Sequence, residues 1–303
     1  MSPTGSILVG GGTGFIGKSL CNLLKQKGYG TTVISRMPGV QRVSWNELQQ
    51  LGLPKNTRAV VNLAGQNVMD VTRRWTAGFK QNIIHSRVNT TKTLAALIDK
   101  SEEKPPVFIV ISGVGAYKPD NSYEYTEDSC VKPYDFFSEL CKDWEEAAQF
   151  QDTETKRKCR IVKIRSGVVL GRDGGMIKQL YLPFFLGLGG PVGDGSQFLP
   201  WIHIDDLINL IIFAIENPLV EGVLNGVAEK PCTNMQFTKA FAKALRRPAL
   251  IPIPSFVFNA LLDKERAVML TEGQKVIPKK TLSLGFRYKY PDIETACNEI
   301  VNK

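Results

Sequence analysis

Three glycines near the start of the chain have a spacing that could hold an anion. Gly11, Gly14 and Gly17 lie in the segment ILVGGGTGFIG, which spans residues 7–17. The apolar residues before them are typical of a short buried strand, and residues 18–27 have the pattern of an amphipathic helix. Gly11 permits a tight turn, Gly14 lets a pyrophosphate approach the backbone, and Gly17 lets the helix lie close to the strand. Because the start of a helix offers unpaired N–H groups, the segment predicts a dinucleotide-binding turn; the alternative is a glycine-rich turn that binds nothing.

The end of the second expected strand indicates which dinucleotide the turn would hold. Residues 31–34 read TTVI and are followed by Ser35 and Arg36. A site that prefers NAD usually has Asp or Glu here, whose carboxylate accepts a hydrogen bond from the ribose 2′-hydroxyl group. A guanidinium group is always charged and can donate several hydrogen bonds to a phosphate. The pair therefore favours NADP(H) over NAD(H); the alternative is a solvated surface arginine in a loop.

Composition and charge limit the class of protein. The chain has 303 residues, of which 43% are hydrophobic and 22% charged, as in an ordinary globular protein with one large or two smaller domains. The net charge of +9 raises the question of nucleic-acid binding, but the basic clusters are short and lack interleaved aromatic residues. No apolar run approaches the roughly 18 residues of a membrane-spanning helix. We therefore predict neither nucleic acid nor membrane as a partner.

Cysteines, histidines and the N-terminal segment bear on metals and on the cellular compartment. The six cysteines are scattered with no C-x-x-C pair, which favours reduced thiols over a disulfide framework or a zinc site. His85 and His203 are the two histidines and are far apart in sequence, so we predict no metal site. The first strand begins within about six residues of the start, with no secretory or Arg-rich leader before it. We expect a cytoplasmic protein, with the mitochondrial matrix as the alternative.

Short apolar strands alternate with helical segments along most of the chain. Further strands are expected at 59–65, 107–111, 160–164 and 222–225, and helices at 73–100 and 135–150. This alternation predicts βαβ crossovers and a doubly wound parallel sheet of the Rossmann type, an α/β fold that binds ligands at the carboxyl ends of its strands. We expect a dinucleotide-binding domain over 1–226, with a mobile glycine-rich loop at 187–195, and a small C-terminal α/β cap for the substrate over 227–303.

Four segments, in this order, resemble those of an extended short-chain dehydrogenase/reductase. They are the glycine turn, N-L-A-G at 62–65, W-I-H-I-D-D at 201–206 and G-V-L-N at 222–225. The third is similar to the F-I-H-V-D-D segment of sugar-nucleotide epimerases and dehydratases. The chain is more similar still to an atypical branch, the epimerase family proteins, which has L-G-G-P and P-W-I-H-I in the middle. That branch also has a C-terminal extension, which here begins with E-G-Q-K-V-I-P at 272–278.

The resemblance implies a set of cofactor contacts. By position these are Thr13, Gly14, Phe15 and Ile16 at the pyrophosphate, Ser35 and Arg36 at the 2′-phosphate, and Leu63, Ala64 and Gly65 at the adenine and its ribose. Arg87 and Arg165 would be further polar contacts near the cofactor. The alternative for both arginines is a structural ion pair.

The catalytic pair of the superfamily is absent. Active members have a Tyr that transfers a proton and, four residues later on the same helix face, a Lys that lowers its pKa. None of the eight tyrosines has a lysine at that spacing, and the expected helix carries Phe137 and Cys141 at the two positions. Phenylalanine has no titratable proton, and Cys141 is best interpreted as buried and inert. Ser112, Tyr117 and Tyr134 remain as candidates for the catalytic group, which stays unassigned.

Two functions fit this combination of motifs. The first is an NADP(H)-dependent oxidoreductase or epimerase-like enzyme that acts on an unidentified small polar substrate, with the proton supplied by a substituted residue or by water. The second is a catalytically inactive NADP(H)-binding sensor or scaffold. An apolar stripe on the 135–150 helix, formed by Phe136, Leu140 and Trp144, fits either a homodimer contact or an ordinary core face.

Overall fold

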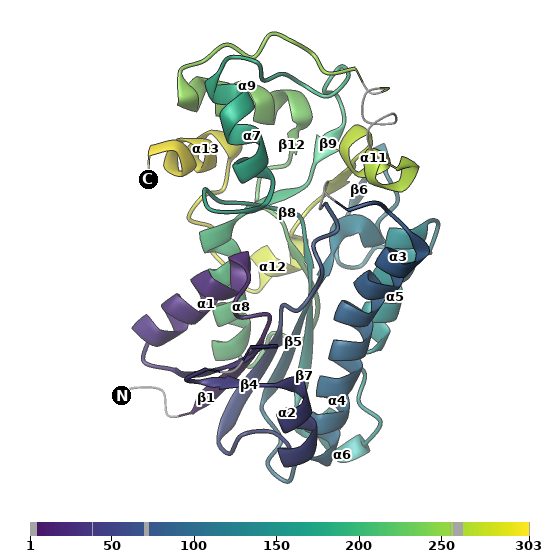
Figure 1. Ribbon diagram of the computed structural model, residues 1–303, viewed down its shortest axis with the longest axis vertical. Helices are drawn as coiled ribbons and strands as arrows, with labels where there is room; N and C mark the ends of the chain where they lie inside the picture. The colour runs from purple at the N-terminus through teal and green to yellow at the C-terminus, as the bar shows by residue number, and fades with distance from the viewer. Residues whose placement is uncertain (1–4, 38, 70–72, 255, 257–262, 303) are drawn as a thin grey trace. The chain divides into compact units, whose positions relative to one another are not determined.

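The computed structural model describes residues 5–37, 39–69, 73–254, 256 and 263–302 (Figure 1). Contacts within the chain divide it into two compact units that alternate along the sequence. The first unit is composed of Met1–Ser112, Glu139–Ile164 and Ile208–Val223, and the second of Gly113–Ser138, Arg165–Leu207 and Leu224–Lys303. The boundary between domains 1–226 and 227–303 stays a prediction.

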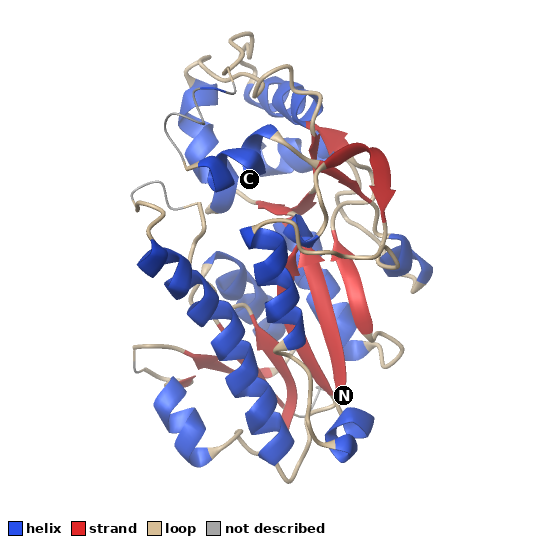
Figure 2. Ribbon diagram, turned by 90° about the vertical axis from the view of Figure 1, so that its right-hand side faces the viewer, coloured by secondary structure: helices blue, strands red, loops and turns tan. Residues whose placement is uncertain are grey.

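A seven-stranded parallel sheet forms the centre of the first unit (Figure 2). Its strands, in spatial order, are β11 (Gly222–Gly226), β7 (Arg160–Ser166), β5 (Val107–Gly113), β4 (Thr57–Asn62), β1 (Ser6–Gly10), β2 (Gly30–Ile34) and β3 (Arg42–Val43). The order runs outward in both directions from β1 and β4, which pair in parallel. This is the doubly wound arrangement of a Rossmann fold, as the sequence predicted.

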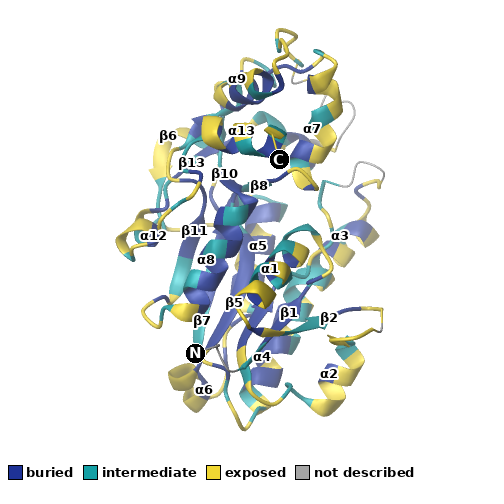
Figure 3. Ribbon diagram, turned by 90° about the vertical axis from the view of Figure 1, so that its left-hand side faces the viewer, coloured by how far each residue is buried: buried dark blue, intermediate teal, exposed yellow. Residues whose placement is uncertain are grey.

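Helices lie on both faces of this sheet (Figures 1 and 3). They are α1 (Phe15–Gln26), α2 (Trp45–Leu51), α3 (Ala77–Ile84), α4 (Thr90–Lys100), α5 (Phe136–Glu146), α6 (Thr153–Lys158) and α8 (Ile204–Glu216). Because both faces are covered, β1 and β5 are apolar at nearly every position. On one face Leu8, Val60 and Phe108 share a core with Leu94 of α4 and Trp144 of α5.

Most predicted elements of the first unit differ by a few residues in extent from those in the structure, and two of the differences have a visible cause. The strand expected at 59–65 ends at Asn62, because the Asn62 side chain accepts a hydrogen bond from the Ala64 N–H group at 3.1 Å and turns the chain. The helix expected at 73–100 is three elements, since a π-helical turn at His85–Asn89 separates α3 from α4. Such turns widen a helix locally and often occur at functional sites.

The second unit contains short helices and three two-stranded sheets. Its remaining elements are η2 (Val114–Ala116), β6 (Asp120–Tyr125), β8 (Val168–Leu170), α7 (Gly175–Phe185), β9 (Phe198–Leu199), β10 (Trp201–His203), β12 (Cys232–Thr233), α9 (Asn234–Leu245), α11 (Lys264–Thr271), β13 (Gln274–Val276), α12 (Lys279–Ser283) and α13 (Ile293–Asn302). The pairs are β10–β8, β12–β9 and β13–β6. Phe237 and Phe241 of α9 lie in its core with Phe184 of α7 and Ile293 of α13.

The glycine-rich segment 187–195 contains no helix or strand, as expected. Its Val192 forms an isolated bridge with Ile253. The mobility of this loop stays a prediction. Among the residues that the structure describes, no helix has the length and apolar character needed to cross a bilayer.

Candidate functional site

The glycine turn joins β1 to α1 in the first unit (Figure 1). Gly11 has a φ of 74°, which favours glycine, and a Cβ atom there would lie 2.6 Å from the Leu63 carbonyl oxygen. A Cβ atom at Gly17 would lie 2.3 Å from the Gly11 oxygen. Neither contact is possible for a real side chain, so this turn requires glycine at both positions. The roles that the spacing predicted for Gly11 and Gly17 have a direct steric cause.

The start of α1 is open to an anion. Gly14 is the N-cap residue and provides no side-chain hydrogen bond to the first turn, and that turn contains no acidic residue. The N–H groups of a first helical turn have no partner within the helix. Together with the positive end of the helix dipole, they form a binding site for one negatively charged group. Thr13, Phe15 and Ile16 lie in or next to this turn.

The turn after β4 lies against the glycine turn. The Leu63 N–H group donates to the Gly10 carbonyl oxygen at 2.8 Å, and the Asn62 amide donates to Thr91 Oγ1 at 2.8 Å. Leu63, Ala64 and Gly65 are thereby held beside Gly11. Sequence reasoning missed Asn62 as the residue that fixes this turn, although it belongs to the N-L-A-G segment.

Two exposed arginines lie near the carboxyl end of β2. Ser35 is buried, and its hydroxyl oxygen accepts a hydrogen bond from the Met37 N–H group at 3.1 Å. Arg36 is exposed and has no hydrogen-bond or ion-pair partner among the described residues. Arg42, also exposed, lies on β3 opposite Val33. Sequence reasoning missed Arg42, because a two-residue strand leaves no periodic signal.

Arg87 lies within the π-helical turn and is a cation among uncharged groups. It donates from Nη2 to the Gln66 carbonyl oxygen at 2.8 Å, and its guanidinium lies 5.2 Å from the centre of the Trp144 ring. A Cβ atom at Gly65 would lie 2.9 Å from the Arg87 Cζ atom. Burial lowers the pKa of Arg87 to about 10, so it remains charged at neutral pH. Arg87 thus places a positive charge at the carboxyl end of β4.

The positions expected to carry the catalytic pair are buried in α5. Phe137 and Cys141 are 8% and 6% exposed. Ser112, at the end of β5, is also buried, and its hydroxyl group donates to Glu145 Oε1 at 2.8 Å. Leu140 and Trp144 of the apolar stripe are buried within the chain, as on a core face, while the homodimer stays a prediction.

In the second unit, Tyr117 is the centre of a buried polar cluster. Its phenol oxygen accepts from Arg165 Nη1 at 3.0 Å, and its hydroxyl group has Asn225 Oδ1 at 2.8 Å and the Thr126 carbonyl oxygen at 3.1 Å as acceptors. Desolvation raises the pKa of Tyr117, which is 1% exposed. Tyr134 is 39% exposed, and its hydroxyl group donates to the Tyr117 carbonyl oxygen at 3.2 Å. Of the two tyrosines, Tyr134 alone is accessible to a small molecule.

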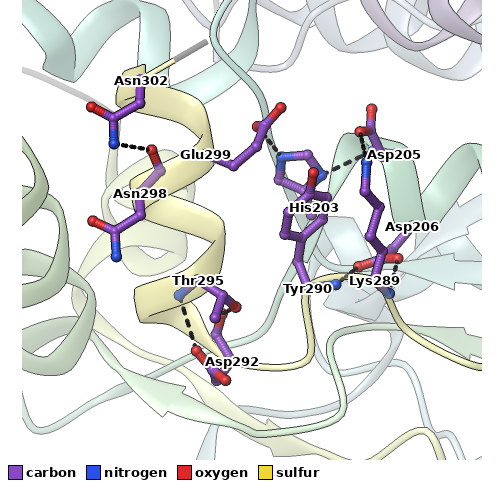
Figure 4. A network of polar contacts seen from close by, with 10 residues as sticks. All are labelled: His203, Asp205, Asp206, Lys289, Tyr290, Asp292, Thr295, Asn298, Glu299 and Asn302. Atoms are coloured by element: carbon purple, nitrogen blue, oxygen red, sulfur yellow. Dashed lines mark hydrogen bonds and ion pairs between the residues drawn. The ribbon is translucent and has the colours of Figure 1, made fainter.

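The W-I-H-I-D-D segment anchors the C-terminal extension within the second unit (Figure 4). The buried Asp206 carboxylate accepts hydrogen bonds from the Lys289 and Tyr290 N–H groups at 2.7 and 2.9 Å. His203 is buried beside the Tyr290 ring, and its Nδ1 atom accepts from the Asp205 N–H group at 3.2 Å. Its Nε2 atom lies 2.9 Å from Glu299 Oε2. Because Nδ1 accepts, the Nε2–H group donates to Glu299, and desolvation lowers the pKa of His203.

Metal ligands do not converge in the described part of the chain, where no group of three or more His, Cys, Asp or Glu residues could hold an ion. The candidate site of the first unit consists of the glycine turn, the N-terminus of α1 and three arginines, which are Arg36, Arg42 and Arg87. This set of groups is suited to a phosphorylated ligand.

Comparisons with known proteins agree with this geometry. Residues 7–225 match the sequence model of the NAD dependent epimerase/dehydratase family, and residues 253–300 match a domain of unknown function, DUF1731. Human epimerase family protein SDR39U1 is 48% identical over 97% of this chain and 99% of its own length. Epimerase family protein YfhF of Bacillus subtilis is 34% identical over 98% of both chains.

Solved structures give the same result. The crystal structure of human SDR39U1 with NADPH has a TM-score of 0.95 and 47% identity, and it covers 98% of this chain and 99% of that one. A UDP-N-acetylglucosamine 4-epimerase from Bacillus cereus, at 18% identity and a TM-score of 0.77 over 99% of both chains, shares the fold alone. The predicted resemblance is confirmed, and the chain belongs to the NAD dependent epimerase/dehydratase family.

Proposed function

We propose that this chain binds NADP(H) in its first unit and acts as an oxidoreductase or epimerase-like enzyme on a small polar substrate. The observation that carries the proposal is the glycine turn. A side chain at Gly11 or Gly17 would collide with backbone atoms, and the start of α1 has no side-chain cap. Both features fit a pyrophosphate that lies against the backbone.

The choice of NADP(H) rests on the charges at the end of β2. Arg36 and Arg42 are exposed there, and residues 35–46 contain no acidic side chain that could hold a ribose 2′-hydroxyl group. A guanidinium group can donate two hydrogen bonds to one phosphate. A structure of the human relative with NADPH supports the same choice.

The residues of this chain divide the work of the reaction. The bound cofactor would supply or accept a hydride. The glycine turn would hold the pyrophosphate, Arg36 the 2′-phosphate, and Arg87 would add a fixed positive charge beside Gly65. We assign the proton to the hydroxyl group of Tyr134, because Tyr134 is 39% exposed, whereas Ser112 and Tyr117 are buried.

A second function is favoured by the absence of the usual pair. Phe137 and Cys141 cannot transfer a proton as the superfamily's Tyr and Lys do, and both are buried. A chain that binds NADP(H) without turnover would act as a sensor, with the cofactor altering its contacts to a partner. The two functions share the first unit's site and differ in the role of Tyr134.

Cofactor binding is tested by titrating the purified chain with NADPH and NADH, followed by fluorescence. We expect NADPH to bind more tightly, and Arg36→Ala to weaken NADPH by roughly 10- to 100-fold, since hydrogen bonds between charged groups contribute about 1.5–3 kcal/mol. NADH affinity should stay unchanged. Arg157→Ala, an exposed arginine on α6, is the matched control. If neither nucleotide binds, both functions are wrong.

Turnover is then followed as NADPH oxidation with pools of small carbonyl compounds. We expect Tyr134→Phe to lower kcat by about 10²- to 10⁴-fold, the usual contribution of general acid catalysis, at unchanged NADPH affinity. Tight binding without turnover from any pool would support the sensor. Turnover that persists in Tyr134→Phe would assign the proton to water.

A further inference from the structure

Two loop segments of the second unit lie side by side. The Arg247 Nε–H group donates to the Phe185 carbonyl oxygen at 2.8 Å, where α7 ends. Farther along, the Ile253 N–H group donates to the Pro191 oxygen at 2.8 Å, and Gly193 donates back to Ile253 at 2.9 Å. Residues 185–193 and 247–253 therefore form one continuous surface. We call this surface, together with Leu182 of α7 and with Lys239 and Lys243 of α9, the basic-apolar face.

Large aliphatic side chains project from this face. Each is more than half exposed, and they are Leu182, Leu186, Leu188, Leu250 and Ile251. Single exposed apolar residues are common on proteins, whereas a group of them marks an interaction surface. These five side chains contribute little to the core and are available to a binding partner.

A groove of about 660 Å³ lies beside these side chains. Met235, Ala242, Leu250 and Pro252 contribute apolar lining, and Lys239, Lys243 and Arg247 contribute three positive charges. The one carboxylate in the lining, Asp194, accepts hydrogen bonds from the Ser196 N–H and hydroxyl groups. The groove thus has an apolar lining and an excess of positive charge.

The cations of the groove are available to a ligand. Lys239 and Lys243 lie one turn apart on α9, and both are exposed. Neither has a hydrogen-bond or ion-pair partner within the described residues. Residues 234–247 include no acidic residue and four basic ones, which are Lys239, Lys243, Arg246 and Arg247.

The sequence predicted no membrane partner from the lack of a spanning segment, but a surface can bind a membrane without one, and we propose that the basic-apolar face binds the surface of an anionic lipid membrane. The leucines would enter the boundary between headgroups and acyl chains, while Lys239, Lys243 and Arg247 would meet the phosphate groups. A second copy of the chain fits less well, because a two-fold contact would bring like charges together. A nucleic acid fits less well, because the lining of the groove between the cations has no aromatic side chain on which a base could stack.

The charge half of the proposal is tested by co-sedimentation of the full chain with phosphatidylglycerol vesicles and with phosphatidylcholine vesicles. We expect binding to the anionic vesicles alone, weakened by salt. The double variant K239E/K243E should weaken binding by roughly 30-fold or more, since each cation near an anionic surface contributes about 1 kcal/mol. K156E/R157E on α6 changes the net charge equally and should bind like the parent chain.

The role of the aliphatic side chains is tested with L186S/L250S, which should also weaken vesicle binding. The control L51S/L219S removes two leucines of similar exposure elsewhere and should bind like the parent chain. The urea denaturation midpoint of each variant reports an intact fold. Equal binding to both vesicles, or equal loss in variant and control, would overturn the proposal. So would a dimer in gel filtration that L186S/L250S converts to a monomer, because the face would then join two copies.

Discussion

The glycine turn of the first unit and the Tyr117 cluster of the second differ in whether their polar groups have hydrogen-bond partners inside the protein. At the turn, Gly14 gives α1 no side-chain cap, so the N–H groups of the first helical turn remain for a ligand. In the cluster, the Tyr117 hydroxyl group is surrounded by Arg165, Asn225 and Thr126. Buried polar groups must find partners, and those satisfied inside the protein are unavailable to a substrate. The N–H groups at the start of α1 are therefore candidates to bind a ligand, whereas the Tyr117 hydroxyl group stabilises the fold.

The same distinction explains why the catalytic candidates differ in value. Ser112 lies at a promising place, the end of β5, yet its hydroxyl group is bonded to Glu145. Tyr134 is 39% exposed, whereas Ser112 and Tyr117 are 5% and 1% exposed. The sequence alone offered no reason to prefer one of Ser112, Tyr117 and Tyr134. The structure favours Tyr134, because it is the exposed one of the three.

The largest effect should come from filling the turn. Gly17→Ala would place a methyl group where 2.3 Å separates it from the Gly11 oxygen, so the turn must shift. We expect NADPH affinity to fall by roughly 100-fold, about 2.7 kcal/mol, because the shifted turn no longer lets the pyrophosphate lie against the backbone. Fluorescence titration measures it. Gly78→Ala, with no atom within 4 Å of the added group, should bind normally; equal loss in both variants would contradict a steric role.

The next effect should appear in stability alone. Tyr117→Phe leaves Arg165 and Asn225 without their shared partner, so we expect a loss of about 1–3 kcal/mol in the free energy of unfolding. Urea denaturation measures this, with Tyr123→Phe, an exposed tyrosine, as control. Unchanged stability with reduced turnover would instead make Tyr117 a catalytic residue.

Ser112→Ala should have a smaller effect of the same kind. It removes one hydrogen bond to Glu145, and we expect a loss of about 1 kcal/mol. NADPH affinity and any turnover should be unchanged. A fall in kcat at constant stability would show that the Ser112 hydroxyl group leaves Glu145 to act on the substrate.

The smallest effect should be a pH dependence of stability from the His203 network. Burial lowers the pKa of His203 in the folded chain. In the unfolded chain the pKa of this imidazole is about 6.5, so the unfolded state binds the proton more readily. Stability should therefore fall as the pH drops below about 6.5 toward the folded pKa. Denaturation midpoints between about pH 5 and 8 measure this. His203→Gln should flatten the profile, whereas His85→Gln, at an exposed position, should leave it unchanged.

The sequence predicted the local elements of the first unit well. The glycine turn, strands at β1, β2, β5, β7 and β11, and the doubly wound class of the sheet follow from apolar runs separated by helical segments. Those signals are local, because a buried strand must be apolar over consecutive residues. The π-helical turn around Arg87 and the two-residue strand that carries Arg42 have no such signal, and the sequence did not predict them.

By itself, the sequence determined that this chain forms a tight glycine turn between β1 and α1, since three glycines at fixed spacing impose backbone geometry directly. The tertiary structure alone decided which polar groups remain available. Tyr117 meets partners 9, 48 and 108 residues away in the sequence, and His203 meets Glu299 across 96 residues. Whether a hydroxyl group is free depends on such distant neighbours, because burial and hydrogen bonding are properties of the folded chain.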